Sequence, residues 1–226
     1  MEINNKRVIV TGGASGIGEA LCKAFARNNA KSVIVVDTNE DRGKKIAKEI
    51  NGNFYYANIS KEKEIIKLID YAEKLYGGTD IFCSNAGIMG MPELLETTAE
   101  EWQNIWEVNV MSHVYAAKHV LPQMLDRGDG YLVNTASAAG LLTQLGAAGY
   151  SVTKSAAVSF AEWIKITYGQ KGIRVSCLCP QAVRTAMTAG GAGVAGVDGM
   201  MEPEDVASEV IKSIQEEIFL ILPQNI

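Results

Sequence analysis

The sequence predicts an α/β protein built on one parallel sheet of about seven strands with helices on both faces. Short apolar runs of strand length alternate along the 226 residues with longer segments whose apolar residues recur at helical spacing. Strands that alternate with helices run parallel and are buried on both faces, which describes a doubly wound sheet. No repeat or low-complexity linker divides the chain, so we expect a single domain over residues 1–226.

The first part of the chain predicts one β-α-β unit. An apolar run at residues 6–11 breaks at the glycine-rich turn Gly12 to Gly18, and a helical pattern follows over residues 19–28. A second buried strand, residues 31–37, ends in an acid. Glycines let the backbone approach a pyrophosphate closely, while the helix start offers free N–H groups and a positive dipole end. The pattern is typical of a Rossmann-type dinucleotide-binding fold.

Asp37 predicts which dinucleotide binds. It lies 19 residues after Gly18, where a carboxylate can accept hydrogen bonds from the adenosine ribose hydroxyls. A 2′-phosphate there would meet like charge, and the following Thr38, Asn39 and Glu40 supply no cation. We therefore predict NAD in preference to NADP. Asp37 could instead cap the next helix, but that alternative leaves the repulsion in place.

The middle of the chain continues the alternation. We predict strands at residues 53–58 and 80–84. Helices are predicted at residues 39–50 and 61–76. Ser60 is the expected cap of the second helix. The fourth strand runs into Asn85, Ala86 and Gly87, small residues that indicate either a ligand against the backbone or an ordinary turn.

In the second half, a long helix is expected to open at Thr98 and to be interrupted at Pro122, with Asn109 as a polar residue on its apolar face. Further expected elements are strands at 130–137, 172–180 and 218–222 and helices at 150–168 and from residue 203. The fifth strand ends in the hydroxyl of Ser137. The glycine-rich residues 188–199 have no periodicity and predict a mobile loop.

Tyr150 and Lys154 stand four residues apart, so a helix places both on one face. A tyrosine hydroxyl titrates near ~10, and a neighbouring ammonium can lower that pKa enough for proton transfer at neutral pH. The same spacing on a solvated face is common and inert. The surrounding motifs favour the catalytic interpretation.

Composition excludes several classes of function. The net charge is -5 and no basic block occurs, which argues against a nucleic-acid surface. We see no signal peptide and no apolar run long enough to span a membrane, so we expect a cytoplasmic protein with reduced thiols. Cys177 and Cys179 share a strand face, but further ligands at metal-site spacing are missing, so we expect core thiols and no metal.

Five motifs in order resemble the short-chain dehydrogenase/reductase family over nearly the whole chain. They are Thr11-Gly12-x-x-x-Gly16-x-Gly18, Asn85-Ala86-Gly87, Asn109, Ser137 and Tyr150-x-x-x-Lys154. The resemblance implies an enzyme that transfers a hydride reversibly between a nicotinamide cofactor and a secondary alcohol or ketone. Such a protein binds a small-molecule substrate and commonly forms a homo-oligomer.

The resemblance also implies roles for individual residues. Tyr150 would be the general acid/base, Lys154 would lower the pKa of Tyr150 and bind the nicotinamide ribose, and Ser137 would hold the substrate oxygen. Asn109 would hold a water that links Lys154 to solvent. The implied cofactor-binding residues are Gly12, Ser15, Gly16, Ile17, Gly18, Asp37, Asn58, Ile59, Asn85, Ala86, Gly87, Tyr150, Lys154, Pro180, Val183 and Thr185.

The chain departs from the family at two places. Family members usually have glycine after the proline of the sixth strand, whereas Gln181 follows Pro180 here. The chain also ends at Ile226, where members commonly continue, so a shorter substrate lid and oligomer interface are expected. Candidate substrate-pocket residues are Met89, Leu141, Leu142, Gln144 and Met187, which are mostly apolar.

Two other interpretations of function remain open at this point. One is a carbonyl reductase that prefers NADP. The other is a cofactor-binding sensor without catalysis, since fold alone does not determine function. Sensors of this kind often lack the tyrosine or the lysine, and this chain has both.

Overall fold

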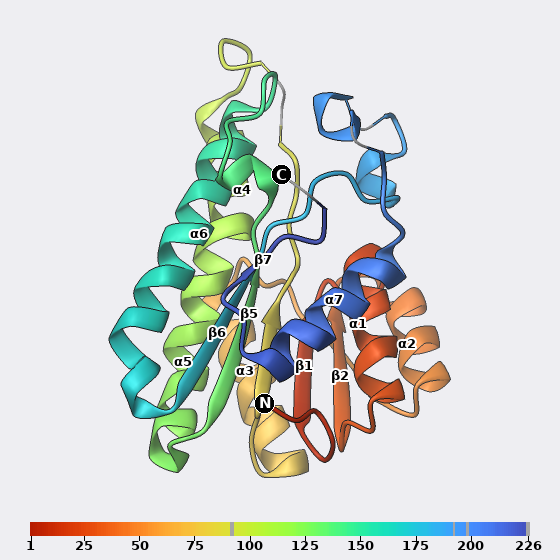
Figure 1. Cartoon of the computed structure of the whole chain (residues 1–226), viewed down its shortest axis with the longest axis vertical. Coiled ribbons are helices and arrows are strands. Elements are labelled where there is room, and N and C mark those ends of the chain that lie inside the picture. Colours follow the sequence, from red (N-terminus) through yellow and green to blue (C-terminus); the bar gives the residue numbers. More distant parts are fainter. Residues whose placement is uncertain (91–92, 192, 198, 225–226) are drawn as a thin grey trace.

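The computed structural model describes residues 1–90, 93–191, 193–197 and 199–224. Seven strands, all paired in parallel, form one sheet in the order β3-β2-β1-β4-β5-β6-β7 (Figure 1). The strands are β1 (Arg7–Thr11), β2 (Ser32–Asp37), β3 (Asn53–Tyr56), β4 (Ile81–Ser84), β5 (Gly130–Thr135), β6 (Ile173–Leu178) and β7 (Leu220–Ile221). The strand order reverses between β1 and β4, which confirms the doubly wound fold.

Helices cover both faces of the sheet (Figure 1). One face carries α1 (Gly16–Arg27), α2 (Glu40–Glu49) and α7 (Pro203–Glu216). The other carries α3 (Glu62–Tyr76), α5 (Ser112–Arg127) and α6 (Ala148–Tyr168), with α4 (Ala99–Trp106) joined to α5 by the π-helical turn Glu107–Met111. Each face therefore encloses its own hydrophobic core.

Alternation within the strands builds the two cores. Val8 and Val10 of β1 pack under α1, while Ile9 between them packs under the opposite helices. Because both faces are buried, the strands appear in the sequence as unbroken apolar runs. All four cysteines are buried and reduced, as expected.

The interruption predicted at Pro122 is wrong, because α5 continues through it to Arg127. Pro122 lies on the exposed side of α5, while Leu121 and Met124 are buried on its core side. Tertiary packing thus outweighs the lost backbone hydrogen bond. The helix leaves its regular α geometry earlier, at the turn that holds Asn109.

Two caps that the sequence suggested, one as a prediction and one as an alternative, are not formed. The Ser60 hydroxyl donates to Asn58 Oδ1 at 2.8 Å and does not cap α3. The N-cap position of α3 is occupied by Lys61. Asn39, not Asp37, caps α2, by accepting the N–H of Arg42 at 3.1 Å. Side chains that the sequence alone assigns to helix caps therefore form local hydrogen bonds near the strand ends instead. No described helix is long and apolar enough to cross a membrane.

Candidate active site

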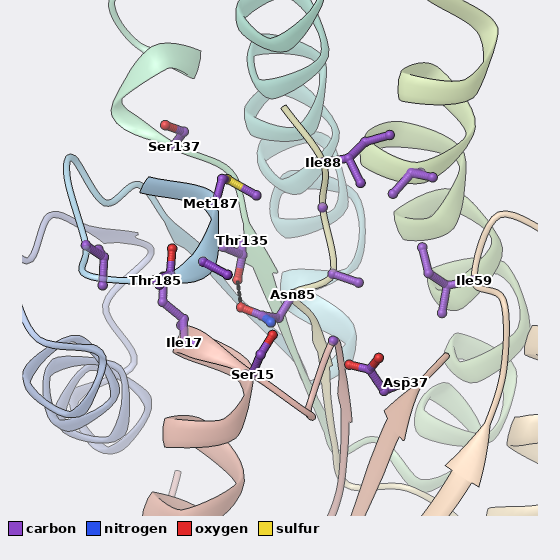
Figure 2. A pocket seen from close by; sticks show the side chains of 18 of the residues that line it. Ser15, Ile17, Asp37, Ile59, Asn85, Ile88, Thr135, Ser137, Thr185 and Met187 are labelled. Atoms are coloured by element: carbon purple, nitrogen blue, oxygen red, sulfur yellow. Dashed lines mark hydrogen bonds between the residues drawn. The ribbon is translucent and has the colours of Figure 1, made fainter. Parts of the chain in front are cut away.

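A cavity of about 590 Å³ lies at the carboxyl edge of the sheet, where the strand order reverses. Residues from both halves of the chain converge on it (Figure 2). Of the predicted site residues, those that line it are Gly12, Ser15, Gly16, Ile17, Gly18, Asp37, Asn58, Ile59, Asn85, Ala86, Gly87, Ser137, Tyr150, Lys154, Pro180, Val183 and Thr185. Asn109 is buried behind the wall.

The glycine turn fits the diphosphate of a dinucleotide. Gly12 and Gly16 have φ of 66° and 52°, and a Cβ on Gly18 would overlap the carbonyl oxygen of Gly12. A Cβ on Gly12 or Gly16 would likewise collide, with Ala86 or Thr185, so the turn requires glycine at these positions. Ser15 flanks the start of α1 without capping it through its side chain, so the first N–H groups of the helix face the cavity.

A hydrogen-bond network fixes the strand ends beneath the glycine turn. The Thr11 hydroxyl accepts the N–H groups of Asn85 and Ala86 at 2.9 and 3.2 Å. The Asn85 side chain donates to the Thr11 carbonyl at 3.0 Å and accepts the Thr135 hydroxyl at 3.2 Å (Figure 2). The motif around Asn85 therefore joins β1, β4 and β5 across the switch point.

Asp37 marks one end of the cavity, opposite Ser137 (Figure 2). Its carboxylate accepts the N–H groups of Ala14 at 3.0 Å and Asn39 at 2.9 Å. Arg42, the cationic residue nearest to Asp37 in the sequence, forms an ion pair with Glu19 at 3.1 Å. Lys154 is the only cation among the described lining residues. The Asp37 end is therefore negative and without a free basic partner.

Ser137, Tyr150 and Lys154 reach the cavity from the end of β5 and from α6. The Lys154 ammonium donates to the Thr135 carbonyl at 2.9 Å and lies 5.5 Å from the Tyr150 ring centroid. The Ser137 hydroxyl accepts the N–H of Ala139 at 3.1 Å. Three groups able to bind and transfer protons thus share one wall.

Burial is the largest influence on the pKa values of Lys154 and Tyr150. It lowers the pKa of Lys154 from 10.5 to about 8, although Cys177 and Cys179 oppose the change. Burial also raises the pKa of Tyr150, with a hydrogen bond to Ser137 acting in the other direction. The net change in the Tyr150 pKa is upward because burial is the largest influence on it, and a lowering of that pKa by Lys154 stays a prediction.

The side-chain amide of Asn109 is hydrogen-bonded to the protein through both of its polar atoms. Its Oδ1 accepts the N–H of Ile88 at 2.9 Å, and its Nδ2 donates to the Ile88 carbonyl at 2.8 Å and to Thr153 Oγ1 at 3.1 Å. Both amide hydrogens are in use, whereas Oδ1 keeps a second acceptor position. A water relay at Asn109 stays a prediction.

The substrate pocket is the least accurate part of the sequence prediction. Met187 lines the cavity, but Met89, Leu141, Leu142 and Gln144 do not. The leucines lie in the segment between β5 and α6 with their side chains exposed. Lining residues that the sequence did not indicate include Thr38, Ile88, Asn104 and Val108, whereas Gln181, noted above as a departure from the family, also lines it. Thr38 and Ile88 follow the ends of β2 and β4, which is the signal that could have identified them.

Comparison with known proteins agrees with this geometry. The family model of short chain dehydrogenases matches residues 6–192. A 1-deoxy-11-beta-hydroxypentalenate dehydrogenase of Streptomyces exfoliatus is 32% identical over 235 residues, covering 100% of this chain and 85% of that protein. A short chain aldehyde dehydrogenase 1 of Euphorbia lathyris is 33% identical over 202 residues, covering 87% of this chain and 70% of that protein.

A solved structure has the same architecture. The 3-ketoacyl-(acyl-carrier-protein) reductase of Brucella melitensis, complexed with NADH, superposes with a TM-score of 0.91 at 26% identity. The match covers 97% of each chain. With the family model spanning most of the sequence, the chain belongs to the short-chain dehydrogenase/reductase family of oxidoreductases.

Proposed function

We propose that the protein is an NAD-dependent oxidoreductase that interconverts a secondary alcohol and its ketone. One observation carries the proposal: Ser137, Tyr150 and Lys154 line the same cavity as the glycine turn and Asp37. Dinucleotide-binding and proton-transferring groups are thus within reach of one bound cofactor. A sensor would need only the first set, and this cavity contains both.

Each residue of the reacting end has a distinct task. When bound, the nicotinamide supplies hydride acceptor or donor chemistry. Tyr150 holds the proton that passes to or from the substrate oxygen, and Ser137 binds that oxygen. Burial keeps the Tyr150 phenol protonated, the form needed to reduce a ketone. In the oxidising direction, the Lys154 ammonium favours the phenolate that must form.

Asp37 supports NAD over NADP. Its carboxylate lies at the cavity wall, and the arginine nearest to it in the sequence, Arg42, is paired with Glu19. A 2′-phosphate would have to displace that pair to find a cation. We expect NAD to bind at least about tenfold more tightly than NADP, or ~1.4 kcal/mol.

The decisive experiment is a screen of secondary alcohols with NAD, followed by the absorbance of the reduced cofactor. With a substrate in hand, Tyr150→Phe should reduce kcat by about a hundredfold or more while NAD still binds. Tyr168→Phe makes the same change at the far end of α6 and should keep the wild-type rate. Near wild-type turnover by Tyr150→Phe would refute the assignment.

We also propose that the protein forms a homo-oligomer through α6. Val152, Trp163 and Ile166 expose 50%, 53% and 74% of their surface and recur at helical spacing. Exposed large apolar side chains on one helix face are typical of an interface. By contrast, His113 of α5 is buried in the core and is not available for such an interface.

A further inference from the structure

Gln181 stands where the family usually has glycine, immediately beside the reacting end of the cavity. It lines the cavity and follows Pro180. The Pro180 carbonyl accepts the N–H of Ala138 at 2.9 Å and the hydroxyl of Ser137 at 3.4 Å. Gln181 therefore directly follows a residue whose carbonyl is hydrogen-bonded to Ser137, the residue proposed to bind the substrate oxygen.

The backbone of Gln181 is held firmly in place by the chain segment after β7. Its N–H donates to Gln224 Oε1 at 2.9 Å, and Gln224 Nε2 donates to the Ala182 carbonyl at 3.0 Å. The next two residues, Ala182 and Val183, are buried. With its main chain fixed on both sides, the residue can present its side chain in only a narrow range of directions.

The side-chain amide of Gln181, unlike its main chain, is uncommitted. Its Oε1 is buried and has no hydrogen-bond partner within the described part of the chain. A buried polar atom without a partner costs about 1–3 kcal/mol, so such a group calls for an explanation. Because Oε1 has almost no accessible surface, a half-turn of the amide, which exchanges the positions of oxygen and nitrogen, decides whether the side chain presents an acceptor or a donor.

The walls around the reacting end offer a ligand mainly apolar surface. Ile88, Val108, Ala186 and Met187 line the same cavity as Gln181. In Figure 2, Ile88 and Met187 lie toward Ser137, and Asp37 lies at the opposite end. Gln181 thus contributes a polar residue to a largely apolar part of the cavity wall.

We infer that Gln181 determines specificity by hydrogen bonding a second polar group of the substrate, close to the carbon that is oxidised or reduced. The preferred substrates are then hydroxyketones and diols, not simple alkyl ketones and alcohols. A site with a buried hydrogen-bonding group rejects analogues that lack its partner, because the protein group stays unsatisfied. This inference rests on the proposed function.

Matched substrate pairs test the inference directly. Acetoin and 4-hydroxy-2-butanone each differ from 2-butanone by one hydroxyl group, on the adjacent or the next carbon. The wild-type protein should reduce at least one of them with kcat/KM at least about tenfold higher than 2-butanone. In Gln181→Met, which keeps the length of the side chain and removes the amide, that ratio should fall to about one.

The controls separate this inference from its alternatives. Gln170→Met makes the same change on the exposed turn before β6, at the opposite edge of the sheet, and should keep the wild-type ratio. Gln181→Ala repeats the test without added bulk. An unchanged ratio in both Gln181 variants, or no wild-type preference, overturns the inference.

Two further outcomes distinguish the sources of failure. Weaker NAD binding by Gln181→Met at an unchanged substrate ratio would place the amide against the cofactor and also overturn the inference. If no ketone or alcohol of any kind is turned over, the proposed function itself fails. The substrate ratio thus reports on Gln181 alone, because it is measured only on an active protein.

Discussion

Among single residues, Lys154 shows most clearly how function opposes stability. Its side chain is 2% exposed, and its ammonium makes one hydrogen bond to the protein, to the Thr135 carbonyl. Burial lowers its pKa to about 8, so at neutral pH the fold carries a mostly charged group that it solvates poorly. The proposed role of the ammonium beside Tyr150 would account for this cost.

We expect Lys154→Met to abolish turnover and to stabilise the fold. At pH 7 the gain should be on the order of 2–3 kcal/mol, because lowering a pKa by one unit costs about 1.4 kcal/mol. Since the folded pKa lies below that of the unfolded chain, the gain should be largest below pH 8 and shrink as the pH rises above it. Urea unfolding of both proteins at pH 7 and pH 9 measures the gap. A gap that widens with pH would contradict this account.

The proposed preference for NAD over NADP rests on the charge of Asp37. Asp37→Ala should bring the dissociation constants of NAD and NADP closer together, by weakening NAD and removing the repulsion of the 2′-phosphate. Titration of both cofactors against the wild-type and variant proteins measures this. Asp41→Ala, on the first turn of α2, removes an acid that does not line the cavity and serves as control. Equal wild-type affinities, or tighter NADP, would refute the preference.

At the level of elements, the junction of β1 and α1 depends on close backbone approach. Gly18→Ala should destabilise the fold by about 1–3 kcal/mol and weaken NAD binding, because its Cβ meets the rigid Gly12 backbone. Gly169→Ala, where a Cβ meets nothing within 4 Å, should change stability by less than about 0.5 kcal/mol. Thermal unfolding with and without NAD compares them. Equal behaviour of the two variants would show that the close approach is unimportant.

The long helical stretch from α4 to α5 shows how packing selects among local preferences. The capping box between Thr98 and Glu101 starts it as the sequence indicates. Its irregular turn, however, lies at Glu107–Met111 and not at Pro122. This turn holds the Asn109 side chain against Ile88 and Thr153, in the wall beside Lys154. The irregularity thus occurs where the site needs a polar group inside the core.

For the whole molecule, assembly is the open question. If α6 forms the interface, the wild-type protein should sediment as a dimer or larger at micromolar concentration. Trp163→Glu with Ile166→Glu should shift it to the monomer, because two charges would be buried in the contact. Glu162→Lys with Lys165→Glu changes neighbouring exposed charges on α6 without touching those side chains and serves as control. A monomeric wild-type protein would dispose of the proposal.

The sequence by itself determined the order of strands and helices and the site motifs. Apolar runs and helical spacing are local properties, and parallel strands bring their carboxyl ends to one edge wherever they occur. For that reason Asp37, Ser137 and Tyr150, more than a hundred residues apart at the extremes, could be expected in one cavity.

Only the tertiary structure decided which side chains meet there. The exposure of Leu141 and Leu142, the hydrogen bonds of the Asn109 amide and the hydrogen bond between Gln181 and Gln224 all depend on segments that are distant in the sequence. Spacing in a sequence places a side chain on a face of its own element. Burial and hydrogen-bond partners come from whatever packs against that face, which no local pattern encodes.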